Sequence, residues 1–204
     1  MVEVIPSVLS LENYTKADSL KGLVKRVQID LMDGKFVETN TLQKFEPKKL
    51  EEWKTFKKDF HLMVEKPTDF IADYSSQARS FCFHFECKQD PRKVITEIRK
   101  TRRLVGLAIN LETKNKDFQD LLELVDFVLV MSVKPGKSGQ NFSDSVLSKI
   151  RCIKRTFNKE ICVDGGINEE NAAKCVKAGA DSLVIGSWLF QQPIRNTVKL
   201  SFIK

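Results

Sequence analysis

The chain has 204 residues, 42% of them hydrophobic and 30% charged, which suits one globular domain spanning residues 1–204 with a sizeable core. No apolar run approaches the roughly 18 residues of a membrane span, and the N-terminus lacks the features of a secretory signal, so we expect a cytoplasmic protein without a membrane partner. The net charge of +7 would steer a small anionic metabolite; because the lysines are spread along the chain and not interleaved with aromatic residues, we expect no nucleic-acid partner.

Strand-like and helix-like segments alternate along the whole chain. Short apolar or alternating runs predict strands, at residues 2–9 (interrupted at Pro6-Ser7), 27–31, 60–64, 80–85, 104–109, 127–131, 160–163 and 182–185. Apolar residues at helical spacing predict the intervening helices, at residues 11–20, 47–56, 66–74, 90–98, 117–125, 144–156 and 168–179, with a further helix in the tail from Pro193.

This alternation predicts a parallel sheet, and eight such units in one small chain predict a (β/α)₈ TIM barrel. A doubly wound open sheet is the alternative fold. It would require a glycine-rich turn after the first strand, whereas this chain has Ser-Leu-Glu at residues 10–12. In a barrel, the functional residues lie at the C-terminal ends of the strands.

Chemically active side chains are found at those predicted strand ends. Asp30 ends an apolar strand, where a carboxylate is costly unless it is paired or bound to a metal. The barrel would bring Asp30, His61 and Asp164 onto one rim although they are far apart in sequence. The other residues at these strand ends are Ser7, His84, Glu86, Met131, Gly165-Gly166 and Gly186-Ser187.

The motifs at these positions resemble those of the ribulose-phosphate 3-epimerases, in the family's order and at nearly its spacing. They are Pro6-Ser7, IDLMDGKFV (29–37), HLMVEKP (61–67), HFE (84–86), VMSVKPGKSGQNF (130–142), VDGGIN (163–168) and IGS (185–187). The resemblance implies a barrel of the ribulose-phosphate-binding type. It also implies an isomerase of the pentose phosphate pathway, which interconverts ribulose 5-phosphate and xylulose 5-phosphate by inverting carbon 3.

The resemblance assigns the two proton-transfer acids to Asp30 and Asp164. One removes the C3 proton, which leaves an enediolate, and the other delivers a proton to the far face. The family holds one divalent metal ion (Zn, Fe, Mn or Co) with two His and two Asp, and Asp30, His61 and Asp164 match three of these ligands. Gln28 stands where the family has the other His. Its side-chain oxygen is a weaker ligand than imidazole, so this chain either keeps a metal with a poorer ligand set or has lost it.

The resemblance also implies the residues that contact a sugar-phosphate substrate. Backbone amides at Gly165-Gly166 and Gly186-Ser187 would bind the phosphate, with the loop Gly136-Lys137-Ser138-Gly139, where the family usually has Gly-Phe-Gly-Gly. Lys137 would either reach the phosphate or remain solvated. The remaining implied contacts are Ser7 and His61 to the substrate and Met32, Met63 and Met131 lining the pocket. His84 also matches a family position, and we expect a hydrogen-bonded structural histidine there.

Two other functions remain open at this point. Gln28 motivates the first, an epimerase-fold protein that binds a sugar phosphate but turns over poorly or not at all. The second is an epimerase of a related hexulose phosphate. We find no Asp-x-Lys-x-x-Asp array, which is typical of the decarboxylase and synthase branch of these barrels. Residues Glu38-Thr39-Asn40 replace the family's usual Pro-Asn segment. Such changes affect the surfaces through which subunits could associate, so the sequence leaves open whether the protein is a monomer or a homo-oligomer.

Overall fold

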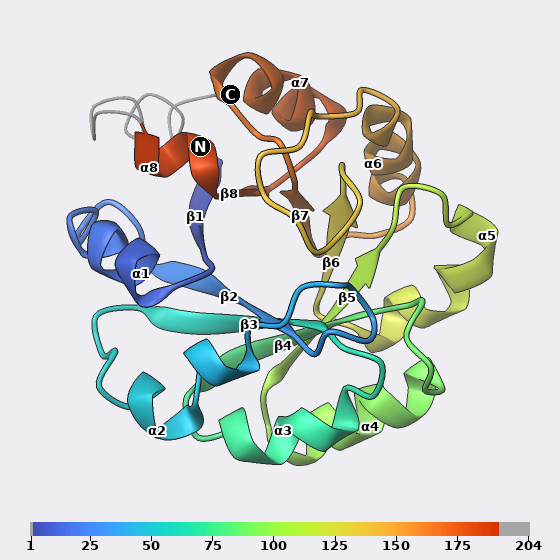
Figure 1. Cartoon of the computed structure of the whole chain (residues 1–204). Helices are drawn as coiled ribbons and strands as arrows, with labels where there is room; N and C mark the ends of the chain where they lie inside the picture. The colour runs from blue at the N-terminus through green and yellow to red at the C-terminus, as the bar shows by residue number, and fades with distance from the viewer. Residues whose placement is uncertain (1, 192–204) are drawn as a thin grey trace.

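The computed structural model describes residues 2–191, and within this range eight parallel strands form a closed barrel in which β8 pairs with β1. Figure 1 shows the strands around the centre and the helices outside them. The strands are β1 (Glu3–Val8), β2 (Arg26–Met32), β3 (Lys57–Met63), β4 (Ala78–His84), β5 (Leu104–Ile109), β6 (Phe127–Met131), β7 (Glu160–Asp164) and β8 (Ser182–Ile185). The predicted (β/α)₈ barrel is therefore confirmed, and the doubly wound sheet is excluded.

Short helices connect the strands. They are α1 (Leu11–Asp18), α2 (Pro47–Leu50), α3 (Thr68–Tyr74), α4 (Pro91–Lys100), α5 (Asn115–Phe118), α6 (Val146–Lys154), α7 (Glu169–Ala178) and α8 (Ser187–Gln191), with 3₁₀ turns η1 (Leu42–Lys44) and η2 (Gln119–Leu124). No helix among residues 2–191 is long and apolar enough to cross a membrane. The helix predicted from Pro193 lies outside the described residues.

Three predicted elements differ from the structure. The strand β1 runs through Pro6 without interruption, because proline removes one donor but tolerates extended backbone. The helix predicted over 47–56 ends at Leu50, and the Trp53 ring instead stacks on Tyr14 with centroids 4.1 Å apart. The helix predicted over 117–125 is a turn of α5 followed by η2.

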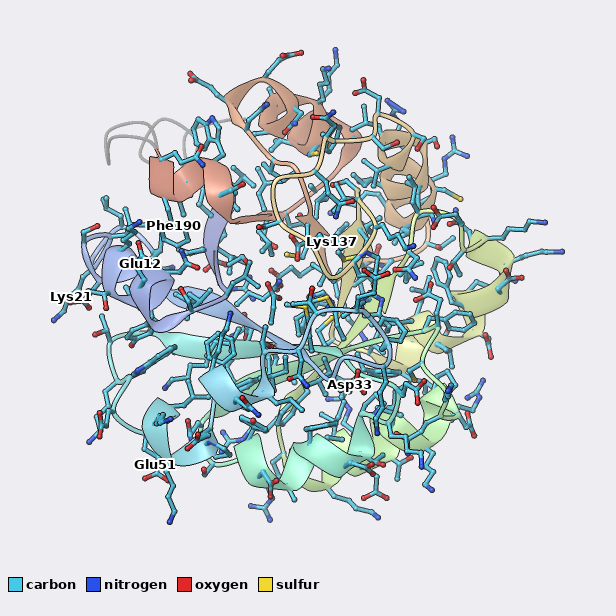
Figure 2. The ribbon with its side chains drawn as sticks, viewed as in Figure 1. Glu12, Lys21, Asp33, Glu51, Lys137 and Phe190 are labelled. Atoms are coloured by element: carbon cyan, nitrogen blue, oxygen red, sulfur yellow. The ribbon has the colours of Figure 1, made fainter. Side chains whose placement is uncertain are left out.

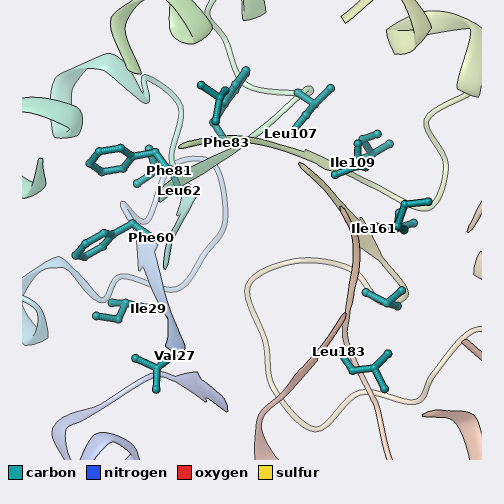
Figure 3. Packing of buried hydrophobic residues seen from close by; sticks show 14 of the residues in the cluster. Val27, Ile29, Phe60, Leu62, Phe81, Phe83, Leu107, Ile109, Ile161 and Leu183 are labelled. Atoms are coloured by element: carbon teal, nitrogen blue, oxygen red, sulfur yellow. The ribbon is translucent and has the colours of Figure 1, made fainter. Parts of the chain in front are cut away.

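The outward-facing residues of the strands form the main hydrophobic core. Alternation along β2 places Val27, Ile29 and Leu31 outside the barrel, where they are completely buried against the helices. Figure 3 shows the corresponding side chains of other strands, such as Phe60 and Phe81, in the same layer between strands and helices.

The inside of the barrel is divided into layers. At the N-terminal end Arg26 forms ion pairs with Glu3, Asp59 and Glu160. Above this network lies a small apolar cluster, made of Ile5, Cys82, Ala108, Phe127, Leu129, Met131, Cys162 and Val184. The polar residues at the C-terminal rim are thus separated by apolar packing from the charges at the base.

Candidate active site

Parallel register brings three distant residues together at the C-terminal rim. Asp30 of β2 and His61 of β3 are direct neighbours in the ladder, and Asp164 ends β7. His61 Nδ1 lies 3.1 Å from Asp30 Oδ1 and 3.8 Å from Asp164 Oδ2. One ligand atom from each residue lies within 4.8 Å of the others. Two carboxylate oxygens and one imidazole nitrogen are a donor set that suits a divalent cation.

Gln28 joins this triad through its side-chain nitrogen. Its Nε2 lies 2.8 Å from Asp30 Oδ1, 2.7 Å from Asp164 Oδ2 and 3.3 Å from His61 Nδ1. The two amide N–H groups therefore donate to the two carboxylates and link them. For the side-chain oxygen of Gln28 to act as a metal ligand, the amide would have to turn over. The donor set fits a divalent cation, whereas the observed orientation of this amide does not help to bind one.

The two carboxylates have different surroundings. Ser7 Oγ donates to Asp30 Oδ2 at 2.8 Å, so that Asp30 accepts hydrogen bonds on both oxygens. Burial, followed by the negative charge of Asp30, raises the pKa of Asp164 to about 7, and the hydrogen bond from Gln28 opposes that shift. A carboxyl group with a pKa near neutrality is suited to giving and taking a proton.

A cavity of about 490 Å³ opens over this triad. Met32, Met63 and Met131 lie in its wall. The other predicted residues that line it are Ser7, Asp30, His61, Gly136, Lys137, Ser138, Gly139, Asp164, Gly165, Gly166, Gly186 and Ser187. This volume is in the usual range for a small-molecule site.

Glycines are required where the loop after β7 enters the cavity wall. Gly165 has φ +115°, and a Cβ there would lie 2.4 Å from a methyl group of Val133. A Cβ on Gly166 would lie 2.7 Å from the backbone oxygen of Gln140. Ser132 Oγ also donates to the carbonyl of Gly165. The loops after β6 and β7 are thereby held together, and Gly165 and Gly166 present only backbone to the cavity.

The loops after β2 and β6 meet over the barrel. Thr39 Oγ1 donates to the carbonyl of Gly136 at 2.7 Å, and Lys137 Nζ lies 3.0 Å from Glu38 Oε2. Figure 2 shows Lys137 and Asp33 near the centre of the view, on these two loops. Lys137 thus has an anionic partner in the protein while it also lines the cavity.

The sequence of this chain matches one family of known proteins. The ribulose-phosphate 3 epimerase family profile matches residues 3–190. The chain belongs to this family. Its members are epimerases, a class of isomerase.

Individual relatives agree with this assignment over nearly the whole chain. The epimerase-family chain is 32% identical to the ribulose-phosphate 3-epimerase of Bacillus subtilis (strain 168), over 96% of this chain and 95% of the relative. It is 30% identical to the enzyme of that name from Chlamydia muridarum, over 94% and 89%. It is 32% identical to the chloroplastic ribulose-5-phosphate-3-epimerase of Arabidopsis thaliana, over 92% and 71%.

Solved structures support the fold of this epimerase-family chain. A tryptophan synthase alpha-subunit from Pyrococcus furiosus superimposes with a TM-score of 0.69, over 97% of this chain and 94% of that one. The sequence identity is 13%, so this likeness concerns the barrel alone.

His84 is a hydrogen-bonded, buried histidine, as we expect from the sequence of this family member. Its Nε2 lies 2.9 Å from His61 Nε2, and its Nδ1 lies 3.3 Å from Glu86 Oε2. Burial lowers the pKa of His84 to about 4, although the hydrogen bond with Glu86 opposes the shift. His84 is therefore neutral at physiological pH.

Sequence reasoning missed several residues of the site. Thr41 Oγ1 donates to the carbonyl of Asp30 and accepts from the Met32 N–H, which fixes the end of β2. Thr41 and Lys44 also line the cavity. Thr41 precedes the 3₁₀ turn η1 and Lys44 ends it. Both lie outside any motif, and no periodic pattern marks them. Glu86 was visible in the HFE motif, but its contact with His84 follows only from the fold.

Proposed function

We propose that this protein is a ribulose-phosphate 3-epimerase that interconverts D-ribulose 5-phosphate and D-xylulose 5-phosphate. The observation that carries the proposal is the pair of carboxylates, Asp30 and Asp164, held on two sides of one amide nitrogen beneath a 490 Å³ cavity. Inversion of a carbon needs one group that removes its proton and another that returns a proton to the opposite face. Family membership supplies the substrate class.

In this proposal the two carboxyl groups exchange roles with the direction of the reaction. One carboxylate takes the proton from C3, and the substrate becomes an enediolate. The other group, in its protonated form, donates its proton to the opposite face of C3. Asp30 accepts hydrogen bonds from Ser7 and Gln28, while burial raises the pKa of Asp164 and so favours its protonated form. The pair can thus hold the single proton that the inversion requires.

Asp30, His61 and Asp164 would hold a divalent cation of the kind that the family uses. When bound, such an ion would act as a Lewis acid and stabilise the negative oxygen of the enediolate. This chain would supply the three ligand atoms. The Gln28 amide would have to turn away from the two carboxylates that it now links, so that their oxygens could bind the ion.

The glycine loops would hold the phosphate at the other end of the cavity. Gly165, Gly166, Gly186 and Ser187 line one part of its wall, and Lys137 lies across it on the loop after β6. Backbone amides at such loops are typical phosphate donors in these barrels, and a nearby ammonium adds charge.

The test is an assay with ribulose 5-phosphate in deuterated water, with and without added Zn²⁺, Mn²⁺ or Fe²⁺. We expect xylulose 5-phosphate that carries deuterium at C3. Gln28 favours one other function, sugar-phosphate binding without turnover, because its amide occupies both acids. Tight binding of substrate with neither product nor deuterium would support that second function. Turnover only of a hexulose phosphate would contradict the proposed substrate.

A further inference from the structure

Both histidines of this chain lie in one contact beneath the active site. His61 directs Nδ1 toward Asp30 and Asp164, and its Nε2 lies 2.9 Å from His84 Nε2. On the far side, His84 Nδ1 lies 3.3 Å from Glu86 Oε2. The two imidazoles are stacked, with centroids 4.9 Å apart, and both residues are completely buried. The contacts form a continuous series from the catalytic carboxylates to Glu86.

A contact between two neutral imidazole nitrogens has one donor and one acceptor. Two arrangements are therefore open. In the first, His84 carries its proton on Nδ1 and donates to Glu86, and His61 donates from Nε2 to His84, which leaves a lone pair on His61 Nδ1. In the second, all protons are reversed: His61 Nδ1 carries a proton toward Asp30, and His84 Nδ1 presents a lone pair to Glu86.

Hydrogen-bond satisfaction favours the first arrangement. Asp30 already accepts from Ser7 and Gln28, one on each oxygen, so it does not depend on His61. Oε2 of Glu86 receives no hydrogen bond other than that of His84 from the residues that the structure describes. The first arrangement also places a lone pair, that of His61 Nδ1, 3.1 Å from Asp30 Oδ1, but Asp30 keeps its two other donors and the Gln28 amide nitrogen lies within 3.3 Å of both atoms. A lone pair on His84 Nδ1 would instead leave Glu86 Oε2 without its donor and add repulsion that no neighbouring N–H relieves among the described residues.

Glu86 is itself held in place as a carboxylate. Its Oε1 accepts hydrogen bonds from the Asn110 N–H and the Thr113 hydroxyl. Lys149 then donates to the carbonyls of Asn110 and Thr113, at 2.6 and 2.5 Å. Burial alone would raise the pKa of Glu86, but its hydrogen bonds bring the pKa below the usual value.

We propose that Glu86 is a positioning residue that acts through His84 to set the tautomer of His61, so that the Nδ1 lone pair faces Asp30 and Asp164. There the lone pair faces the position where a cation would bind, with the Gln28 amide nitrogen 3.3 Å away. The catalytic consequence rests on the proposed function, whereas the tautomer does not.

The substitution Glu86→Gln tests this directly. The amide oxygen of the new side chain can still accept from Asn110 and Thr113, while its NH₂ replaces Oε2 and donates to His84 Nδ1. That donation would force the second arrangement. Because the chain has two histidines, protein labelled with ¹⁵N-histidine gives four ring nitrogens, whose ¹⁵N shifts and long-range proton couplings report both tautomers without interference.

We expect the wild type to carry protons on His84 Nδ1 and His61 Nε2, and Glu86→Gln to carry them on His84 Nε2 and His61 Nδ1. Thr113→Val, which removes one loop contact of Glu86, and Glu112→Gln, an exposed carboxylate on the same loop, should keep the wild-type pattern. A proton on His61 Nδ1 in the wild type, or identical tautomers in wild type and Glu86→Gln, would overturn the proposal.

Activity and metal titrations complete the test. Glu86→Gln should weaken Zn²⁺ or Mn²⁺ binding and lower kcat by roughly 10–100-fold, the usual effect of losing a partner of a ligating histidine, with KM nearly unchanged. A tautomer reversal in a protein without epimerase activity would refute the proposed function and leave the role of Glu86 intact. Full epimerase activity, together with the same tautomers in wild type and Glu86→Gln, would support the proposed function and refute the role of Glu86.

Discussion

Lys137 and Glu38 form an ion pair between the loops after β6 and β2, with their charged atoms 3.0 Å apart. Both side chains are largely exposed, so the pair adds little to stability. Both residues also depart from the usual sequence of the family's motifs, and only the fold shows that the two departures meet. Since Lys137 lines the cavity, a substrate phosphate would compete with Glu38 for its ammonium group.

This competition predicts opposite effects of two substitutions on KM. Lys137→Met should raise KM severalfold with little change in kcat, because a cation near the phosphate is lost. Glu38→Gln should lower KM, because Lys137 no longer has a carboxylate partner. Steady-state kinetics at low and high salt measure both effects, which should shrink as salt screens the charges. Lys174→Met, on the outside of α7, is the matched control. Equal KM values in all three variants would show that Lys137 does not meet the phosphate.

Asp30→Asn and Asp164→Asn should each reduce epimerisation by roughly 10²–10⁴-fold, the usual contribution of a positioned acid or base. Each amide keeps the shape of the carboxyl group but cannot transfer the proton. The rate of product formation and the deuterium content at C3 should be measured together. A variant that exchanges the C3 proton without inversion has kept one of the two acids, which would identify the face that each acid serves. Activity near that of the wild type in either variant would remove that residue from the mechanism.

Gln28→His should tighten zinc and iron binding and raise activity at limiting metal. Imidazole would replace an amide that now directs N–H groups at both carboxylates, and imidazole suits these ions better than a neutral amide oxygen does. Calorimetric titration of wild type and variant with each ion measures the affinity independently of turnover.

Gln28→Leu is the matched control, since it removes both the donor and any ligand atom. It should separate the two carboxylates by repulsion and weaken the site further. If the wild type binds no divalent ion at millimolar concentration and still epimerises at full rate, metal assistance is refuted for this protein.

Gly106→Ala should destabilise the barrel by about 1–3 kcal/mol, the usual cost of overpacking a core. A Cβ on Gly106 would lie 2.3 Å from the ring of Phe127, inside the barrel. Urea unfolding of the single variant and of Gly106→Ala/Phe127→Leu measures the effect. The double variant should lose less stability than the sum of the single changes, because leucine makes room for the methyl group. If the losses of stability in the two single changes simply add in the double variant, the cost of Gly106→Ala does not come from the contact with Phe127.

The sequence predicted the rim of the barrel better than its interior contacts. Asp30, His61 and Asp164 could be expected to converge, because parallel strands in one barrel all end on the same side. The orientation of the Gln28 amide could not be expected, since it depends on carboxylates that meet only after the barrel closes. Leu50 and Trp53 have helical spacing, but Trp53 packs on Tyr14, a partner that lies far away in sequence.

The ion-pair network at the base of the barrel bears on how the chain is made. Arg26 pairs with carboxylates of β1, β3 and β7, and β1 itself takes its second neighbour from β8. During synthesis Arg26 therefore lacks its partner Glu160 until β7 has left the ribosome. One edge of β1 has no neighbouring strand until β8, which begins at Ser182, has also emerged. An incomplete chain exposes unpaired strand edges, which invite association with other chains. Cells that make this protein would need the last strand to be completed promptly, or a chaperone to shield the first.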